Sequence, residues 1–285
     1  MSPTAQEAFK FCEKIAKSHY ENFPVGWFIP KVSRKFVYAV YAFARMADDF
    51  SDEPRFESDR TARLDDFGKR LDLAMTGQVA AGDFLFTALM ETLEKTDIPA
   101  KLLKDLLTAF RMDTAKKRYK NYQELQSYCV YSANPIGRIV LALFGYKDPK
   151  LLSLSDQICT GIQLVNHWQD IAVDLAKDRV YLPEEDMNRF GYSYDDLYSR
   201  KINGNFQALL RFEISRTRSL FFEGKPLLNA LHRKLRWQVG LMWLGPMKVL
   251  EKIEENGYDI FHKRPSLTKA NLIRLFLPIL FGKFS

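Results

Sequence analysis

The chain has 285 residues, enough for one or two domains with a sizeable core. Hydrophobic residues make up 47% and charged residues 27%, and no uncharged apolar run reaches the roughly 18 residues of a membrane span. The net charge of +7 suits anionic ligands or surfaces. A nucleic-acid partner is not expected, because no zinc-finger spacing, RNP-like signature or basic arm is present. Three separated cysteines and an N-terminus without an apolar signal core predict a cytoplasmic protein.

Helical patterns follow one another along the whole chain. The predicted helices, in chain order, are 4–19, 33–52, 57–76, 82–94, 99–115, 124–145, 151–176, 206–222, 231–256 and 266–281. Residues 124–145 are expected to be interrupted at Ser132–Pro135, because proline removes a hydrogen-bond donor. No alternating strand pattern or internal repeat is found. We therefore predict an all-α fold that forms a single domain over residues 1–285.

One stretch of the predicted helix 151–176 carries oxygen ligands at helical spacing. Asn166, Asp170 and Asp174 are four residues apart and would lie one turn above another on one helix face. Gln163 and His167 fall in the same polar sector. Hard cations such as Mg²⁺ take oxygen ligands and commonly use one or two carboxylates together with substrate phosphates. The stretch is interpreted as half of a metal–diphosphate site.

A second acidic stripe lies on the predicted helix 33–52. Asp48 and Asp52 are one turn apart, with Tyr41 and Arg45 in the same sector of roughly 100°. Either stripe alone is compatible with a solvated helix face. Basic residues are scarce in both, however, and the narrow polar sectors are typical of helices surrounded by protein. Together the stripes favour cations bridged by a diphosphate, which would make pyrophosphate a stabilised leaving group.

The motifs that contain these stripes resemble those of the squalene/phytoene synthase family. The matching segments are Tyr41–Asp52, Tyr128–Arg138, Gln163–Asp174 with its continuation to Pro183, and Gly257–Phe261 with Arg264. They occur in the family's order and span essentially the whole chain. The resemblance implies an isoprenoid-synthase-type helical bundle around a central active-site cavity.

Departures from the family pattern indicate a branch. Gln169 stands where most members have Arg, and Val173 where most have Glu. Ala133–Pro135 replaces the usual Ala-Gly pair, and Tyr20–Val25 precedes the first motif. In these features the chain is similar to the hydroxysqualene synthases of bacterial hopanoid biosynthesis. The resemblance implies magnesium-dependent ionisation of presqualene diphosphate, opening of its cyclopropane ring and capture of the cation by water, with no NADPH expected.

The resemblance also implies roles for individual residues. The expected magnesium ligands are Asp48, Asp52, Asp170 and Asp174, with Asp49 of lesser importance. The expected diphosphate contacts are Ser18, Arg45, Asn166, Arg179 and Tyr181. The residues expected near the reacting carbons are Tyr41, Tyr128, Asn134 and Gln169. Asn134, Gln169 and His167 are candidates to position the attacking water.

Simpler interpretations stand beside these roles. Arg45 is also compatible with an ion pair to Asp48 or Asp49, and the tyrosines with packing. For His167 a hydrogen-bonded structural role is favoured over that of a base. The charge run Lys116–Arg118 is predicted to be a solvated face.

The apolar segment 266–281 is too short to span a membrane. Two interpretations of this segment remain open. It would either dock on the bundle or enter the membrane interface to receive a greasy substrate, which would make the protein peripheral on the inner face of the plasma membrane.

Two other functions remain compatible with the sequence. The first is head-to-head condensation of two farnesyl or geranylgeranyl diphosphates, as in squalene, phytoene or dehydrosqualene synthases. The second is a non-catalytic assembly factor that retains the fold. Intact carboxylates in both acidic motifs argue against the assembly factor.

Overall fold

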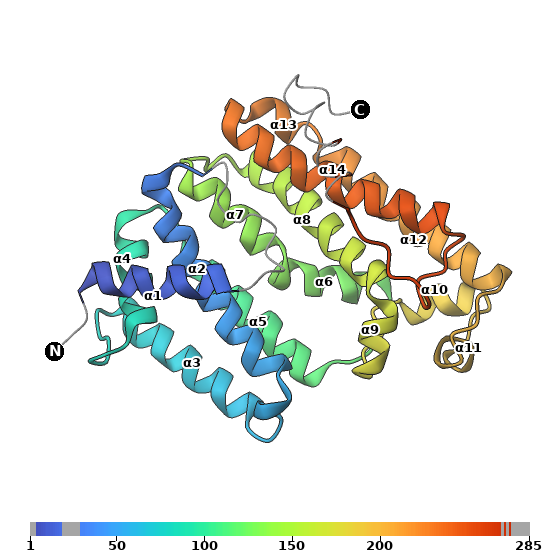
Figure 1. Ribbon diagram of the computed structural model, residues 1–285, viewed down its shortest axis with the longest axis horizontal. Helices are drawn as coiled ribbons and strands as arrows, with labels where there is room; N and C mark the ends of the chain where they lie inside the picture. The colour runs from blue at the N-terminus through green and yellow to red at the C-terminus, as the bar shows by residue number, and fades with distance from the viewer. Residues whose placement is uncertain (1–3, 19–28, 269–270, 272–273, 275–285) are drawn as a thin grey trace. The chain divides into compact units, whose positions relative to one another are not determined.

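The computed structural model describes residues 4–18, 29–268, 271 and 274, and all regular structure in these residues is helical (Figure 1). In chain order the elements are α1 (Ala5–Ser18), α2 (Lys31–Asp52), the single-turn 3₁₀ helix η1 (Pro54–Phe56), α3 (Arg60–Met75), α4 (Phe84–Lys95), α5 (Lys101–Ala115), α6 (Tyr122–Ser132), α7 (Asn134–Leu143), α8 (Pro149–Gln169), α9 (Ile171–Ala176), α10 (Glu184–Arg189), α11 (Tyr194–Tyr198), α12 (Gly204–Gly224), α13 (Leu227–Ala230) and α14 (Arg233–Glu255). The predicted all-α class is confirmed. None of the helices in these residues is long and apolar enough to cross a membrane.

The bounds of three predicted helices differ in the structure. The segment 57–76 becomes α3, which begins at Arg60, and the turn before it is η1, with Pro54 at its first position, where the missing N–H costs nothing. The segment 151–176 becomes α8 and α9, separated at Asp170. The segment 231–256 begins two residues late, at Arg233, because the His232 side chain accepts from the backbone N–H of Leu235 and caps α14. The predictions for 20–25 and for most of 266–281 lie outside the described residues.

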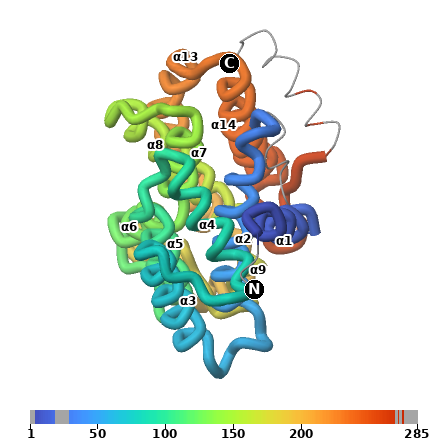
Figure 2. Tube along the Cα trace, turned by 90° about the vertical axis from the view of Figure 1, so that its left-hand side faces the viewer, coloured from blue at the N-terminus to red at the C-terminus, as the bar shows by residue number. Residues whose placement is uncertain are grey.

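The helices form two compact units, which are described separately, and the single-domain prediction stays a prediction. Unit 1 comprises Met1–Ala115 and Pro135–Asp148. Its central helix is α2, which packs against α1, α3, α4 and α5, and Figure 2 shows α2 beside α1 and α4. The apolar face of α2 is buried: Phe43 stacks on Phe67 with ring centroids 5.1 Å apart, and Phe86 closes the cluster at 5.1 Å from Phe67. The acidic stripe is therefore carried by the helix around which unit 1 is built.

Unit 2 comprises Lys116–Asn134 and Pro149–Ser285, and its central helix is α8. α8 packs against α6, α9, α12, α13 and α14. The fully buried Trp168 donates from Nε1 to Oγ1 of Thr217 on α12 at 2.9 Å. Gly224 lets α12 approach α8 closely, because a Cβ there would lie 2.5 Å from Cγ1 of Ile158. The second acidic stripe thus also begins on the central helix of its unit.

The charge run Lys116–Arg118 is partly solvated, as predicted, and it also connects two segments of unit 2. Lys117 is half exposed, but its carbonyl accepts from the N–H of Val180 at 2.9 Å. Arg118 donates to the carbonyl and carboxylate of Asp178 and to the Tyr198 hydroxyl. These contacts fix the chain that follows the second acidic stripe.

Candidate active site

The first acidic stripe occupies the last two turns of α2. Arg45 Nη2 lies 2.8 Å from Oδ1 of Asp49, and its Nη1 lies 3.4 Å from Oδ2 of Asp48. Glu53 adopts an extended conformation before Pro54, as expected for a residue preceding proline, and this ends the helix directly after Asp52. The stripe is thus a same-helix ion-pair cluster. The structure shows the alternative interpretation, in which Arg45 forms ion pairs within its own helix. The contact of Arg45 with a diphosphate stays a prediction.

The second acidic stripe keeps its helical spacing across the break between α8 and α9. Asp170 has φ −105° and ψ 12°, outside the helical geometry of its neighbours. Its N–H nevertheless donates to the carbonyl of Asn166 at 2.9 Å, and its own carbonyl accepts from Asp174 N–H at 2.8 Å. Backbone bonds four residues apart on both sides of the break place the three residues one turn above another. Asn166 is exposed, whereas Asp170 and Asp174 are half-buried.

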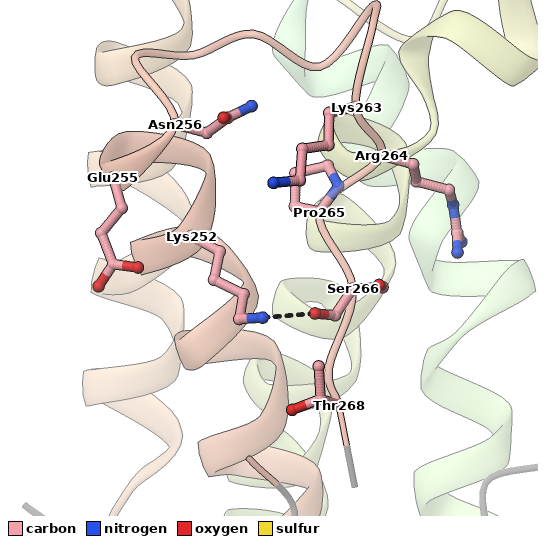
Figure 3. Close-up of a pocket in the computed structure, with 8 residues that line it drawn as sticks. All are labelled: Lys252, Glu255, Asn256, Lys263, Arg264, Pro265, Ser266 and Thr268. Atoms are coloured by element: carbon pink, nitrogen blue, oxygen red, sulfur yellow. Dashed lines mark hydrogen bonds between the residues drawn. The ribbon is translucent and has the colours of Figure 1, made fainter. Parts of the chain in front are cut away.

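A short segment after α14, residues 263–268, packs against the second stripe and is here called the strap. Arg264 donates through Nη2 to Oδ2 of Asp170 at 3.0 Å and through Nε to Oδ1. Gln169 donates from Nε2 to the carbonyl of Pro265. Lys252 on α14 donates to the carbonyl of Ser266 at 2.6 Å, and Figure 3 shows this bond with Lys263 turned toward α14 and Arg264 turned away from it. The strap is therefore tied both to α14 and to the start of the second stripe.

The sequence motifs included Arg264 without giving it a role. Its contact with Asp170 joins residues 94 positions apart, and no local spacing indicates such a pair. Gln169 was expected near the reacting carbons. Its amide nitrogen donates to the strap in this structure, and its expected place near the reacting carbons stays a prediction.

Four aromatic rings gather beside the second stripe. His167 stacks on Tyr181 with centroids 3.7 Å apart and planes 15° apart. Tyr128 lies 5.9 Å from His167 and 5.8 Å from Tyr181. Tyr119 stacks on Tyr181 at 5.5 Å. Tyr128 and Tyr181 were predicted site residues, and the structure brings them together. Tyr119 was missed because it lies outside every motif.

His167 is buried rather than part of an exposed polar sector. Its side chain is 4% exposed, and burial lowers its pKa to about 3, so the imidazole is neutral at physiological pH. Its Nε2 lies 3.4 Å from Nε2 of Gln163. The sequence placed His167 on the polar face because its type is polar. Stacking on Tyr181 supplies the apolar surroundings that a neutral imidazole tolerates.

The other predicted site residues have separate local partners. Asn134 is buried at the start of α7, and its Oδ1 accepts from Oγ1 of Thr160 at 2.9 Å. Ser18 is exposed at the end of α1 and donates to the carbonyl of Ile15 at 2.9 Å. Tyr41 is half-buried on α2. Arg179 lies directly after the second stripe, where its N–H donates to the carbonyl of Asp174 at 2.9 Å.

A small cavity is lined by several of the predicted site residues. Asp174, Arg179, His167 and Tyr181 all line it. A carboxylate, a guanidinium and an aromatic pair therefore meet at one point of unit 2.

The acidic stripes fit a hard divalent cation. Among the described residues, no three His, Cys, Asp or Glu side chains gather closely enough to hold a metal by themselves. Each stripe offers only oxygen donors, the ligand type that Mg²⁺ prefers, and Mg²⁺ commonly completes its octahedron with water and substrate phosphates. The residues present therefore fit magnesium held jointly with a diphosphate.

Comparisons with known proteins identify relatives over nearly the whole chain. Residues 15–271 match the family described as squalene/phytoene synthase. The crystal structure of squalene synthase HpnC from Alicyclobacillus acidocaldarius is 37% identical, with a TM-score of 0.85 and a match covering 90% of this chain and 96% of that one. The 15-cis-phytoene synthase of Synechocystis sp. is 28% identical over 97% of this chain and 85% of its own length. A dehydrosqualene synthase crystallised with a ligand, 24% identical, has a TM-score of 0.87 over 98% of this chain and 97% of that one, which shows the shared fold.

Proposed function

Since the chain belongs to the squalene/phytoene synthase family, we propose that it is the hydroxysqualene synthase of that family. Membership confirms the resemblance based on the motifs, and it makes the protein an enzyme of the head-to-head prenyltransferase type that acts on prenyl diphosphates. The family uses divalent metal with these substrates. The proposal goes further and names presqualene diphosphate and water as the two reactants.

The observation that carries the proposal is the uncharged Gln169 at the position where most members have arginine. Its amide is hydrogen-bonded to Pro265 of the strap, so the residue adds no positive charge beside the second stripe. The 37% identity to squalene synthase HpnC, compared with 28% to the phytoene synthases, favours a squalene-type over a phytoene-type member of the family.

The proposed reaction breaks the carbon–oxygen bond of presqualene diphosphate, and the diphosphate leaves with the electron pair. The cyclopropane then opens, water adds to the allylic cation, and loss of a proton gives a C30 alcohol. No electrons enter from outside, so no reductant is consumed. Magnesium, when bound, supplies positive charge that stabilises the leaving diphosphate.

The chain's own residues have distinct parts in this proposal. Asp48, Asp52, Asp170 and Asp174 supply the carboxylates for the metal ions, and Asn166 lies one turn before Asp170. Arg45 and Arg179 supply cationic contacts for the diphosphate. Tyr128 and Tyr181 belong to the buried aromatic cluster beside the second stripe, where they would wall the substrate cavity. Because His167 is neutral, it places no charge beside the carbocation.

Turnover of presqualene diphosphate tests the proposal. The purified protein is incubated with presqualene diphosphate, Mg²⁺ and ¹⁸O-labelled water, without NADPH. The expected product is a C30 alcohol that carries the label. A hydrocarbon product, or turnover only when two farnesyl diphosphates are supplied, would overturn the assignment.

The 28% identity to several phytoene synthases favours a second candidate, the condensation of two prenyl diphosphates. Parallel incubations with farnesyl or geranylgeranyl diphosphate alone test it. The assembly-factor interpretation is tested with Asp48→Asn and Asp170→Asn. Unchanged turnover in both variants would contradict the metal–diphosphate site.

A further inference from the structure

Asp178, just after α9, has a backbone conformation that residues with a side chain rarely adopt. Its φ of 56° lies in the left-handed region. Its N–H donates to the carbonyl of Leu175 at 3.0 Å, and the N–H of Arg179 donates to the carbonyl of Asp174 at 2.9 Å. Helices that end with these two bonds usually have glycine at this position, because glycine has no Cβ to clash. The reason for an aspartate here therefore lies in its side chain.

Three side chains from two other segments of unit 2 converge on the Asp178 carboxylate. Lys117 donates from Nζ to Oδ2 at 3.2 Å, the Tyr198 hydroxyl of α11 donates to Oδ1 at 3.0 Å, and Arg118 also donates to Oδ1. Hydrogen bonds from Arg118, Tyr198 and Lys117 lower the pKa of the Asp178 carboxyl to about 2, so the group is ionised. Each contact is partly exposed and weak alone, but together they form a network on one carboxylate. These four residues are here called the clamp.

The clamp fixes the backbone on both sides of Arg179. On one side Asp178 is held through its carboxylate. On the other side the N–H of Val180 donates to the carbonyl of Lys117 at 2.9 Å. Arg179 itself lines the small cavity together with Asp174 of the second stripe. The residue between the two attachment points is thus a predicted contact of the diphosphate.

The short helix α11 connects the clamp with the wall of the same cavity. Tyr198 at its end donates to Asp178, and the preceding residue, Leu197, is fully buried and lines the cavity. A capping box at Ser193 starts the helix. The helix therefore supplies both an apolar wall residue and one donor of the clamp.

We infer that Asp178 is a positioning residue for Arg179, and that the three donors of the clamp act through it. An arginine whose backbone is already fixed loses less conformational freedom when it binds an anion. The clamp thereby keeps Arg179 ready at the cavity beside Asp174. The inference rests on the proposed function, since it assumes that Arg179 contacts the diphosphate, and it adds the residues that set this contact.

Calorimetric binding of inorganic diphosphate at a fixed Mg²⁺ concentration tests the inference on the full-length protein without turnover. Asp178→Gly keeps the left-handed backbone, removes the carboxylate and is expected to weaken diphosphate binding about tenfold. Because it also removes a negative charge, a general electrostatic effect would strengthen the binding of an anion instead. Arg179→Gln loses a charge-assisted contact and is expected to weaken binding about 30-fold. In Asp178→Gly/Arg179→Gln the loss is expected to stay within about twofold of that in Arg179→Gln alone, which a merely structural role of Asp178 would not produce.

Arg200→Gly is the matched control. Arg200 follows α11 with a φ of 53°, and the N–H groups of Arg200 and Lys201 donate to the carbonyls of Leu197 and Asp196 in the same two-bond pattern. Its side chain is exposed. Diphosphate binding in Arg200→Gly is expected to stay within about twofold of that of the unmodified protein. A loss as large as in Asp178→Gly would show that glycine at a left-handed position, and not the missing carboxylate, weakens binding, and would overturn the inference.

Tyr198→Phe tests the clamp independently of any change at Asp178. It removes one donor, keeps the ring and is expected to weaken diphosphate binding about threefold. Unchanged binding in both Asp178→Gly and Tyr198→Phe, or additive losses in the double variant, would overturn the inference and leave the proposed function standing. If the unmodified protein bound no diphosphate, the metal–diphosphate site itself would be contradicted, and the inference with it.

Discussion

Arg264 is hydrogen-bonded through two nitrogen atoms to both carboxylate oxygens of Asp170. The two-point geometry is the strong form of an arginine–carboxylate pair. Solvent weakens it here, because the Arg264 side chain is 53% exposed and that of Asp170 is 27% exposed. A guanidinium thus lies against the oxygen atoms that are predicted to bind magnesium. Cation and guanidinium are expected to compete for them.

Replacing Arg264 is therefore expected to strengthen metal binding. In Arg264→Gln the repelling charge is lost, and Mn²⁺ affinity without diphosphate is expected to rise about fivefold, the equivalent of a partly exposed ion pair. The Mn²⁺ affinity is measured by electron paramagnetic resonance of the free Mn²⁺. Lys263→Gln is the matched control, since Lys263 is the neighbouring strap residue turned toward α14 (Figure 3). Equal or weaker Mn²⁺ binding in Arg264→Gln than in Lys263→Gln would refute the competition.

Close contact between α8 and α12 predicts a clear difference between two glycines of α12. In Gly224→Ala the new Cβ would lie 2.5 Å from Cγ1 of Ile158 and 2.9 Å from the carbonyl oxygen of Leu154. Backbone cannot rotate away as a flexible side chain does, so the free energy of unfolding is expected to fall by about 1–3 kcal/mol. In Gly204→Ala the Cβ meets nothing within 4 Å. Urea unfolding of both variants checks the pair, and similar losses would contradict the packing argument.

The central helices were the most predictable part of the fold. In α2 and α8 the apolar residues recur at helical spacing and are buried, as Phe43 and Trp168 illustrate. The break at Asp170 could not be predicted from the sequence. The predicted ligands are four residues apart both in a continuous helix and across this break, where the backbone hydrogen bonds four residues apart are kept. Residue spacing therefore located the second stripe correctly but not the helix end inside it.

The surroundings of the stripes were less predictable because they depend on tertiary contacts. Tyr119 joins Tyr181 across 62 positions, and Arg264 reaches Asp170 across 94. The helical wheel placed His167 in a polar sector, and residue type alone does not show that its ring stacks and stays neutral. The favoured structural role of His167 agrees with its burial and its contact with Gln163. The joint metal site of both stripes stays a prediction.

Glu213 is expected to make the protein less stable as pH rises. The side chain is fully buried, and burial holds its pKa well above the ordinary value, against the opposing effect of Arg216. The folded state therefore keeps a proton that the unfolded state releases above its pKa of 4.5, and the free energy of unfolding falls from that pH up to the folded pKa. The slope is at most about 1.4 kcal/mol per pH unit.

The variant Glu213→Gln isolates this effect. It mimics the protonated carboxyl, so its stability is expected to fall less between pH 5 and pH 8 than that of the unmodified protein, by about 1.4 kcal/mol for each pH unit inside the window. Denaturant unfolding at several pH values provides the measurement. Glu94→Gln, an exposed residue, is the control and is expected to leave the pH dependence unchanged. If the free energy of unfolding varied with pH in the same way in Glu213→Gln and in the unmodified protein, Glu213 would be ionised in the folded state.

His167 is expected to act in the opposite direction, at acid pH. Burial lowers its pKa from 6.5 to about 3, so the unfolded state binds a proton that the folded state does not. Its stabilising contribution is fully present above pH 6.5 and is lost as pH falls toward 3. In His167→Phe, which keeps a ring against Tyr181, this acid-side loss is expected to disappear. His232→Phe removes the cap of α14 and is expected to lower stability at every pH while retaining the acid-side loss. Nuclear magnetic resonance titration of the His167 ring checks the cause directly, and a midpoint near 6.5 would show that burial does not lower its pKa.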